Sequence, residues 1–176
     1  MNVFILNTGR CGSTTFIKAC EHIKNYTCAH ESLSTLTGSQ RLAYPSQHIE
    51  ADNRLSWFLG RLDQAYGNDA FYIHLIRNKQ QVIESFSKRE SFGIMQAYKN
   101  GILLGGKTDQ TAKQIAADYI ETVESNIRLF LKDKKNTMTF SLETADKDFN
   151  EFWNRISAEG DLQAALKEWH VNYNAS

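Results

Sequence analysis

The first sixteen residues, MNVFILNTGRCGSTTF, constrain the fold more than any other part of the chain. Their apolar run predicts a buried strand over residues 3–7, which leads into a loop of Gly, Ser, Thr and one arginine at 7–15. A helix is expected over 13–25. A strand that passes through a glycine-containing loop to a helix N-terminus brings backbone N–H groups together, and the helix dipole adds positive potential. The sequence therefore predicts a phosphate-type anion site at this connection.

Further strands and helices alternate along the chain. A nearly continuous apolar run predicts a strand at 70–76, and the short segments at 26–30 and 137–142 are also interpreted as strands. Apolar residues at helical spacing, with their end signals, predict helices at 46–66 (ending at Gly67), 79–89, 108–132 and beyond the last strand. Residues 33–46 are expected to form a surface loop, and 91–107 a mobile or pocket-covering segment.

This alternation predicts an α/β fold, a P-loop-like three-layer sandwich in which helices flank a central parallel sheet. The run at 70–76 is apolar almost throughout, as is typical of a central parallel strand buried on both faces. A length of 176 residues fits one domain, 1–176. Because ligands of such sheets bind at the carboxyl ends of the strands, the loop at 7–15 is expected at the binding edge.

Composition excludes several classes of protein. Lys+Arg and Asp+Glu number 20 each, so there is no overall basic field for nucleic acid and any anion site is local. No apolar run approaches the roughly 18 residues of a membrane span. The three cysteines form no CxxC pair and the histidines lack ligand spacing, so neither a disulfide framework nor a metal site is expected. The expected setting is reducing and cytoplasmic.

The loop differs from the ATP-binding pattern GxxxxGK[ST] in the position of its cation. Aligning Gly12-Ser13-Thr14 on Gly-Lys-Thr places Ser13 where the phosphate-binding lysine would be, and the positive charge lies instead at Arg10. An enzyme that uses ATP or GTP would lose its main contact to the β- and γ-phosphates. The loop still suits a terminal anionic group that needs one cation and several N–H or O–H donors.

In these residues the chain resembles the sulfotransferases that use 3′-phosphoadenosine 5′-phosphosulfate (PAPS), as a short, bacterial-type member. Their first signature is a Lys/Arg-x-Gly-[Thr/Ser]-Thr loop that holds the 5′-phosphosulfate, and it corresponds here to the run from Arg10 to Thr15. Their second is a strand that ends in arginine, with a serine eight residues later, both reaching the 3′-phosphate. Here these are Arg77 and Ser85. The resemblance covers about residues 1–90.

The chain also departs from that family. Asn78-Lys79 stands where members often have Asp-Pro, and the basic, glycine-containing segment near the C-terminus is absent in recognisable form. Residues at the C-terminal end that could take its place are Lys167, His170 and Asn172.

The resemblance implies sulfuryl transfer from PAPS to a hydroxyl or amine, with adenosine 3′,5′-bisphosphate (PAP) as product and no metal. Arg10 would stabilise the charge that develops on the leaving 5′-phosphate. Glu31, with His30 as the second choice, would be the base. Further residues expected to bind the nucleotide are Gly9, Cys11, Gly12, Ser13, Thr14, Thr15, Arg77 and Ser85. The acceptor is a small molecule, a glycan or a lipid, and nothing in the sequence distinguishes these.

Two other functions stay open at this point. A P-loop kinase-like phosphotransferase conflicts with the missing loop lysine and with the lack of an acidic Mg²⁺ partner. A non-catalytic nucleotide-binding module fits the short chain and the weak C-terminal phosphate contact. The loop residue Cys11 lacks an adjacent base pattern, so it is interpreted as a small residue that fits the turn and not as a nucleophile.

Overall fold

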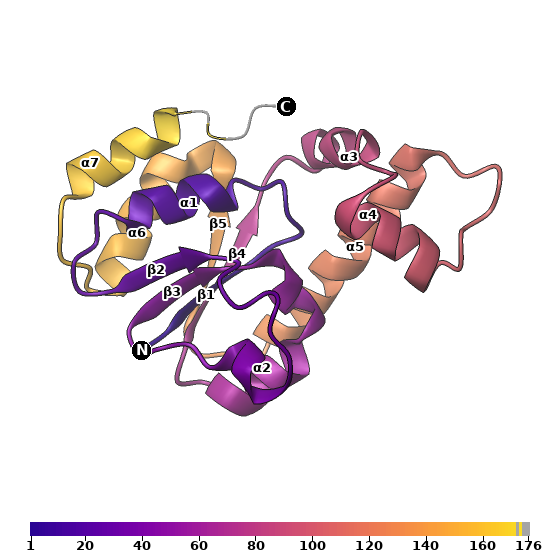
Figure 1. The fold of residues 1–176 in the computed structure, drawn as a ribbon. Coiled ribbons are helices and arrows are strands. Elements are labelled where there is room, and N and C mark those ends of the chain that lie inside the picture. The colour runs from indigo at the N-terminus through magenta and orange to yellow at the C-terminus, as the bar shows by residue number, and fades with distance from the viewer. Residues whose placement is uncertain (172, 174–176) are drawn as a thin grey trace.

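The computed structural model describes residues 1–171 and 173, and its centre is one five-stranded parallel sheet (Figure 1). The strands are β1 (Val3–Leu6), β2 (Thr27–His30), β3 (His48–Ala51), β4 (Phe71–Ile76) and β5 (Thr137–Ser141). Their order in the sheet is β2-β3-β1-β4-β5, and every neighbouring pair is parallel. The first strand is therefore central, and the loop that follows it opens at the middle of the carboxyl edge.

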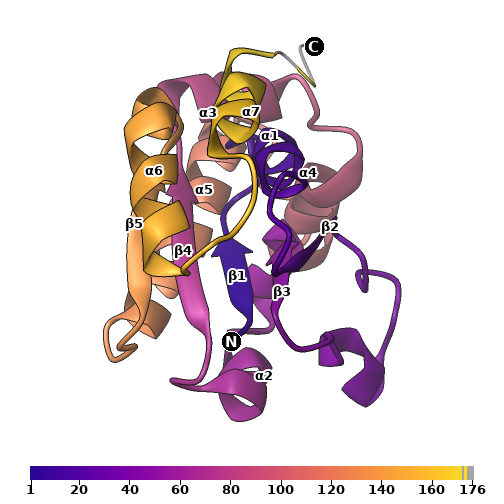
Figure 2. The same cartoon turned by 90° about the vertical axis from the view of Figure 1, so that its left-hand side faces the viewer.

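Helices cover both faces of this sheet. They are α1 (Ser13–Cys20), α2 (Leu59–Tyr66), α3 (Lys79–Ser87), α4 (Gly93–Ala97), α5 (Ala112–Leu131), α6 (Ala145–Arg155) and α7 (Leu162–Lys167). Figure 2 shows α1, α6 and α7 in front of the sheet and α5 behind it. The sandwich of helices and parallel strands that the sequence predicts is confirmed.

Aromatic side chains build the core on each side. In front, Phe16 of α1 packs against Phe140 of β5 and Phe152 of α6, with ring centroids 4.9 and 5.2 Å apart. Behind, Tyr72 of β4 meets Phe130 of α5 edge-on at 5.1 Å. Because side chains alternate across a strand, β4 contributes to both cores and is buried throughout except at its last residue. β4 is therefore packed on both faces up to the residue before its carboxyl end.

The predicted helix at 46–66 is wrong over its first half. That segment contains β3, then a 3-10 turn at Asn53–Trp57, and only then α2. Residues 48–51 are buried on both faces because β3 fills the place between β2 and β1, and its ladder hydrogen bonds outweigh the helical spacing of the apolar residues.

Other predicted boundaries shift for local reasons. The first helix ends at Cys20 and not at residue 25, since Ile23 bridges to Gly160 and the Lys24 N–H donates to the Glu159 carbonyl. The long helix predicted from 108 begins at Ala112, where Thr111 and Gln114 form a capping box. The helix predicted to 89 ends at Ser87.

The two loops contain more structure than predicted. Residues 33–46 hold a 3-10 turn and bury Arg41, Leu42 and Tyr44, so they are not a simple surface loop. Residues 91–107 contain α4 and a π-helical turn at Tyr98–Ile102. Within the described part of the chain, no helix has the length and apolar character needed to cross a membrane.

Candidate functional site

The loop between β1 and α1 takes its shape from left-handed backbone conformations. Gly9, Arg10 and Gly12 have φ values of 91°, 61° and 93°. The Asn7 side chain accepts a hydrogen bond of 2.7 Å from the Gly9 N–H, which turns the chain directly after the strand. The Tyr119 hydroxyl of α5 donates to the Thr8 carbonyl at 2.8 Å. The loop is therefore held from within and from behind.

The N-terminus of α1 opens into a pocket. Gly12 is the N-cap residue and has no side chain, so it cannot satisfy the N–H groups of the first turn as Ser or Asp would. An alanine Cβ at Gly12 would lie only 2.8 Å from Cδ1 of Leu142. Together, the αL conformation and the close packing favour glycine here, and the open first turn is suited to an anion.

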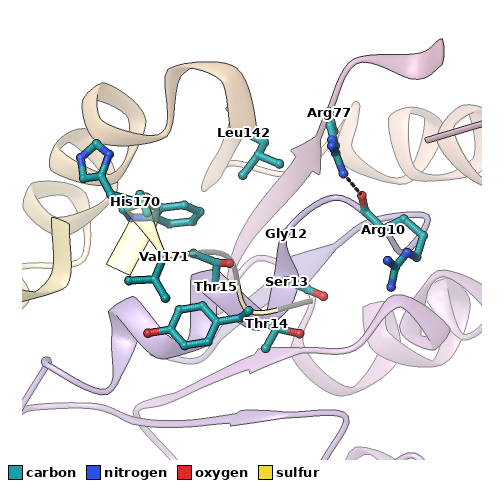
Figure 3. Close-up of a pocket in the computed structure, with 11 residues that line it drawn as sticks. Arg10, Gly12, Ser13, Thr14, Thr15, Arg77, Leu142, His170 and Val171 are labelled. Carbon is teal, nitrogen blue, oxygen red and sulfur yellow. Dashed lines mark hydrogen bonds between the residues drawn. The ribbon is translucent and has the colours of Figure 1, made fainter. Parts of the chain in front are cut away.

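Arg10, Arg77 and Ser85 lie together, although they are far apart in the sequence. Arg77 follows β4 and donates from Nη1 to the Arg10 carbonyl at 3.3 Å (Figure 3). Nε of Arg10 donates to the Ser85 hydroxyl of α3 at 2.9 Å. Burial lowers the pKa of Arg10, and the nearby guanidinium groups of Arg89 and Arg77 lower it further. The strand-end pattern therefore creates a cluster of positive charge beside the loop.

A first pocket of about 400 Å³ lies over the N-terminus of α1. Its floor comes from the loop and from the first turn of the helix, and its far wall comes from the C-terminal segment (Figure 3). The lining residues are Arg10, Gly12, Ser13, Thr14, Thr15, Arg77, Leu142, Trp169, His170, Val171 and Tyr173. Of the C-terminal candidates, His170 lines this pocket, Lys167 is not among the lining residues, and Asn172 lies outside the described residues.

A second pocket of about 290 Å³ adjoins the first at the loop. Both pockets share Arg10, Ser13 and Thr14. The remaining residues of the second pocket are Gly9, His30, Glu31, Asn53, Arg54, Phe86, Arg89, Phe92, Gly93, Ile94 and Met95. The loop thus borders two spaces, one over the helix N-terminus and one bounded by the end of β2, the 3-10 turn Asn53–Trp57, α3 and α4.

Both candidate bases lie in the second pocket. The ring nitrogen Nε2 of His30 is 3.0 Å from the Ser13 hydroxyl, which links this residue to the phosphate loop. Glu31 follows directly, has a φ of 52°, and pairs with Arg54, with Oε2 and Nη1 2.7 Å apart. The structure thus brings both residues to the loop.

Buried carboxylates of β3 and its end hold this second edge. Glu50 accepts hydrogen bonds from the Ser32 N–H and hydroxyl, each at 2.7 Å. Asp52 accepts from the Arg54 N–H at 2.8 Å and pairs with the buried Arg41. Both carboxylates are fully buried. Hydrogen bonds to charged groups are among the stronger ones, so these contacts fix the turn that carries Glu31.

Two residues that the sequence assigns to the nucleotide site do not line the pockets. Cys11 and Ser85 are not among the described residues that line either pocket. The Cys11 side chain is buried against Thr8, and burial raises the pKa of its thiol to about 11. A thiol protonated at neutral pH is a poor nucleophile, which supports the interpretation of Cys11 as a residue that fits the turn. No group of His, Cys, Asp or Glu in the described chain is arranged to hold a metal ion.

Sequence reasoning missed Arg54 and Arg89. Arg54 follows β3, so the wrongly predicted helix concealed its place at a strand end. Arg89 lies one helical turn beyond Ser85 and donates from Nη1 to the Ser85 carbonyl at 3.0 Å. Its spacing of four residues from Ser85 was a usable signal, because such residues share one face of a helix.

Comparison with known proteins points to one fold. No protein-family model and no curated protein sequence matches the chain. Among solved structures it is similar to the sulfotransferase domain from the curacin biosynthetic pathway, with a TM-score of 0.63 and 14% sequence identity. The alignment covers 99% of this chain and 78% of that domain. At this identity the likeness concerns the fold, and the chain therefore has the fold of a sulfotransferase domain.

Proposed function

We propose that this chain is a PAPS-dependent sulfotransferase that moves a sulfuryl group to a hydroxyl or amine acceptor. The observation that carries the proposal is the position of Arg10, in a phosphate-type loop, where this residue lines both pockets. A group transfer needs a donor on one side and an acceptor on the other, with a cation where they meet. The shared fold with a sulfotransferase domain supports the same conclusion.

The residues of the first pocket fit a sulfuryl donor whose ribose carries phosphate groups at the 5′ and 3′ positions. The uncapped first turn of α1 offers N–H donors for the 5′-phosphosulfate, with Arg10 beside it. Arg77 lines the same pocket from the end of β4, and Ser85 lies on the adjoining helix. In this proposal Arg77 and Ser85 serve the 3′-phosphate. Trp169 and Val171 supply an apolar wall for the adenine ring of the nucleotide.

When bound, PAPS supplies the sulfuryl group: its sulfur–oxygen bond to the 5′-phosphate breaks as a bond to the acceptor oxygen or nitrogen forms, and PAP leaves. Arg10 stabilises the charge that appears on the leaving phosphate oxygen. Glu31 or His30 takes the proton of the acceptor, because both lie in the second pocket beside the loop. Ser13 joins the two sides through its contact to His30.

Separate replacement of the two arginines tests this assignment. Arg10→Ala should lower kcat by about 10²- to 10³-fold, because it removes a group that acts on charge formed in the transition state. Arg77→Ala should mainly weaken PAP binding and raise the KM for PAPS. Steady-state kinetics and calorimetry with PAP measure both effects.

Lys113→Ala, at an exposed position on α5, is the matched control and should leave kinetics and binding unchanged. An Arg10→Ala variant that transfers at the wild-type rate would overturn the mechanism. Tight PAP binding without transfer to any acceptor would instead favour the non-catalytic nucleotide-binding module.

A further inference from the structure

The second pocket combines positively charged and apolar side chains. Three arginines line it from separate segments: Arg10 from the loop, Arg54 from the 3-10 turn after β3, and Arg89 from beyond α3. Among the described lining residues, Glu31 is the single carboxylate. The lining therefore carries an excess of positive charge, although the chain as a whole has a formal net charge of zero.

Another part of the lining is apolar. Phe86 and Met95 form its inner part and are only 3% and 1% exposed. Phe92 and Ile94 continue it outward, and Phe92 leaves 55% of its surface in contact with solvent. A large aromatic side chain exposed at the rim of a pocket is typical of a surface that binds an apolar group.

The arginines are held in place by fixed partners. The backbone N–H of Arg54 donates a hydrogen bond of 2.8 Å to the Asp52 carboxylate, and the Arg54 guanidinium forms an ion pair with Glu31. Arg89 donates a hydrogen bond to the carbonyl of Ser85. The hydroxyl of the same serine accepts a hydrogen bond from Nε of Arg10. Repulsion from Arg89 contributes to the lowered pKa of Arg10, so these two guanidinium groups are close enough to interact. A bound anion would relieve that repulsion.

We infer that the acceptor is an amphiphilic anion: a hydrocarbon body that carries the reacting hydroxyl and, separately, a carboxylate or similar anionic group. The anionic group would bind Arg54 and Arg89, and the hydrocarbon would lie on Phe92 and Ile94. This inference rests on the proposed function, because it treats the second pocket as the acceptor side of the transfer.

Binding of ligands matched in length tests the inference and requires no sulfuryl transfer. Each ω-hydroxyalkanoate from 4-hydroxybutanoate to 8-hydroxyoctanoate is compared with the diol of the same length, by calorimetry on the intact protein with and without PAP. The best hydroxy acid should bind about tenfold or more tightly than its diol, because its hydrogen bonds to guanidinium groups are charge-assisted. Equal affinities across the series would overturn the inference.

Single substitutions test which residues cause the preference for the hydroxy acid over the diol. Arg54→Gln and Arg89→Gln should each remove most of the preference for the acid while PAP affinity is retained, and Phe92→Ala should weaken acid and diol alike. Lys88→Gln, an exposed neighbour of Arg89 with the same change in charge, should keep the preference. If Arg89→Gln weakens PAP binding and leaves the preference intact, Arg89 belongs to the nucleotide site and the inference is wrong.

The same samples separate this inference from the proposed function. Failure of the wild-type protein to bind PAP would contradict the sulfotransferase proposal. The comparison of acid with diol in the absence of nucleotide would still decide which ligand class the second pocket takes. Saturable binding of the acid that Arg54→Gln and Arg89→Gln abolish would support the assignment of the pocket in that case as well.

Discussion

The phosphate loop (residues 7–15) and the base segment (residues 30–32) lie at the same edge of the sheet but are held in different ways. The phosphate loop is shaped mainly by its own backbone, with left-handed conformations at Gly9, Arg10 and Gly12. The base segment depends on carboxylates buried beneath it, Glu50 and Asp52, which belong to another strand and its end. A local pattern therefore predicts the first region, whereas only the assembled sheet produces the second.

The largest expected effect concerns the base segment. Asp52→Asn should lower the free energy of unfolding by about 3–5 kcal/mol, because it leaves the buried guanidinium of Arg41 without its carboxylate partner. Denaturant unfolding measures the change. Glu121→Gln breaks an exposed pair with Lys79 and should change stability far less. If both substitutions cost the same, the base segment is not held by buried charge.

The second prediction is that low pH destabilises the sheet that carries both regions. Burial lowers the pKa of His74 on β4 from 6.5 to about 4, so the unfolded chain binds this proton first. Stability should therefore fall as the pH drops below 6.5, by about 3 kcal/mol once the pH is below 4. His74→Gln should remove that part of the pH dependence, as measured by unfolding at several pH values. An unchanged slope would show that folding does not shift the pKa of His74.

A smaller effect is expected at the phosphate loop. Gly12→Ala should cost about 1–2 kcal/mol, because alanine is strained at a φ of 93° and its Cβ would press on Leu142. Adding Leu142→Ala should relieve the contact but not the backbone strain. Gly60→Ala in α2, with open space around it, should be neutral or stabilising. Thermal unfolding of the three variants separates these causes, and a harmless Gly12→Ala would contradict a loop built on backbone geometry.

The same contrast explains how much the sequence could predict. Largely apolar runs predict β1 and β4, the short run at 137–142 predicts β5, and the β1 loop follows from Gly9, Gly12 and their neighbours. These signals are local, because a buried strand and a tight turn each restrict the residues that form them. The resemblance to PAPS-dependent sulfotransferases assigned Arg10 and Arg77 to one site, and in the structure the two residues are in contact.

The missed features depend on partners that are distant in sequence. His48 and Glu50 are polar residues in a fully buried strand, where Thr27 forms a hydrogen bond with His48 and Ser32 donates one to Glu50. No window of sequence contains both members of these pairs. The error at β3 then concealed Arg54 and, with it, the charged character of the second pocket.

The most direct test of the central claim compares nucleotides by thermal unfolding of the wild-type protein. A ligand that binds the folded state raises its stability, by about 2.7 kcal/mol at a hundredfold excess over Kd. We predict a clear rise in Tm with PAP and little change with ADP or Mg·ATP, because the loop has Arg10 and no lysine at Ser13. A rise with Mg·ATP that equals or exceeds the rise with PAP would contradict the proposed function and favour a phosphotransferase.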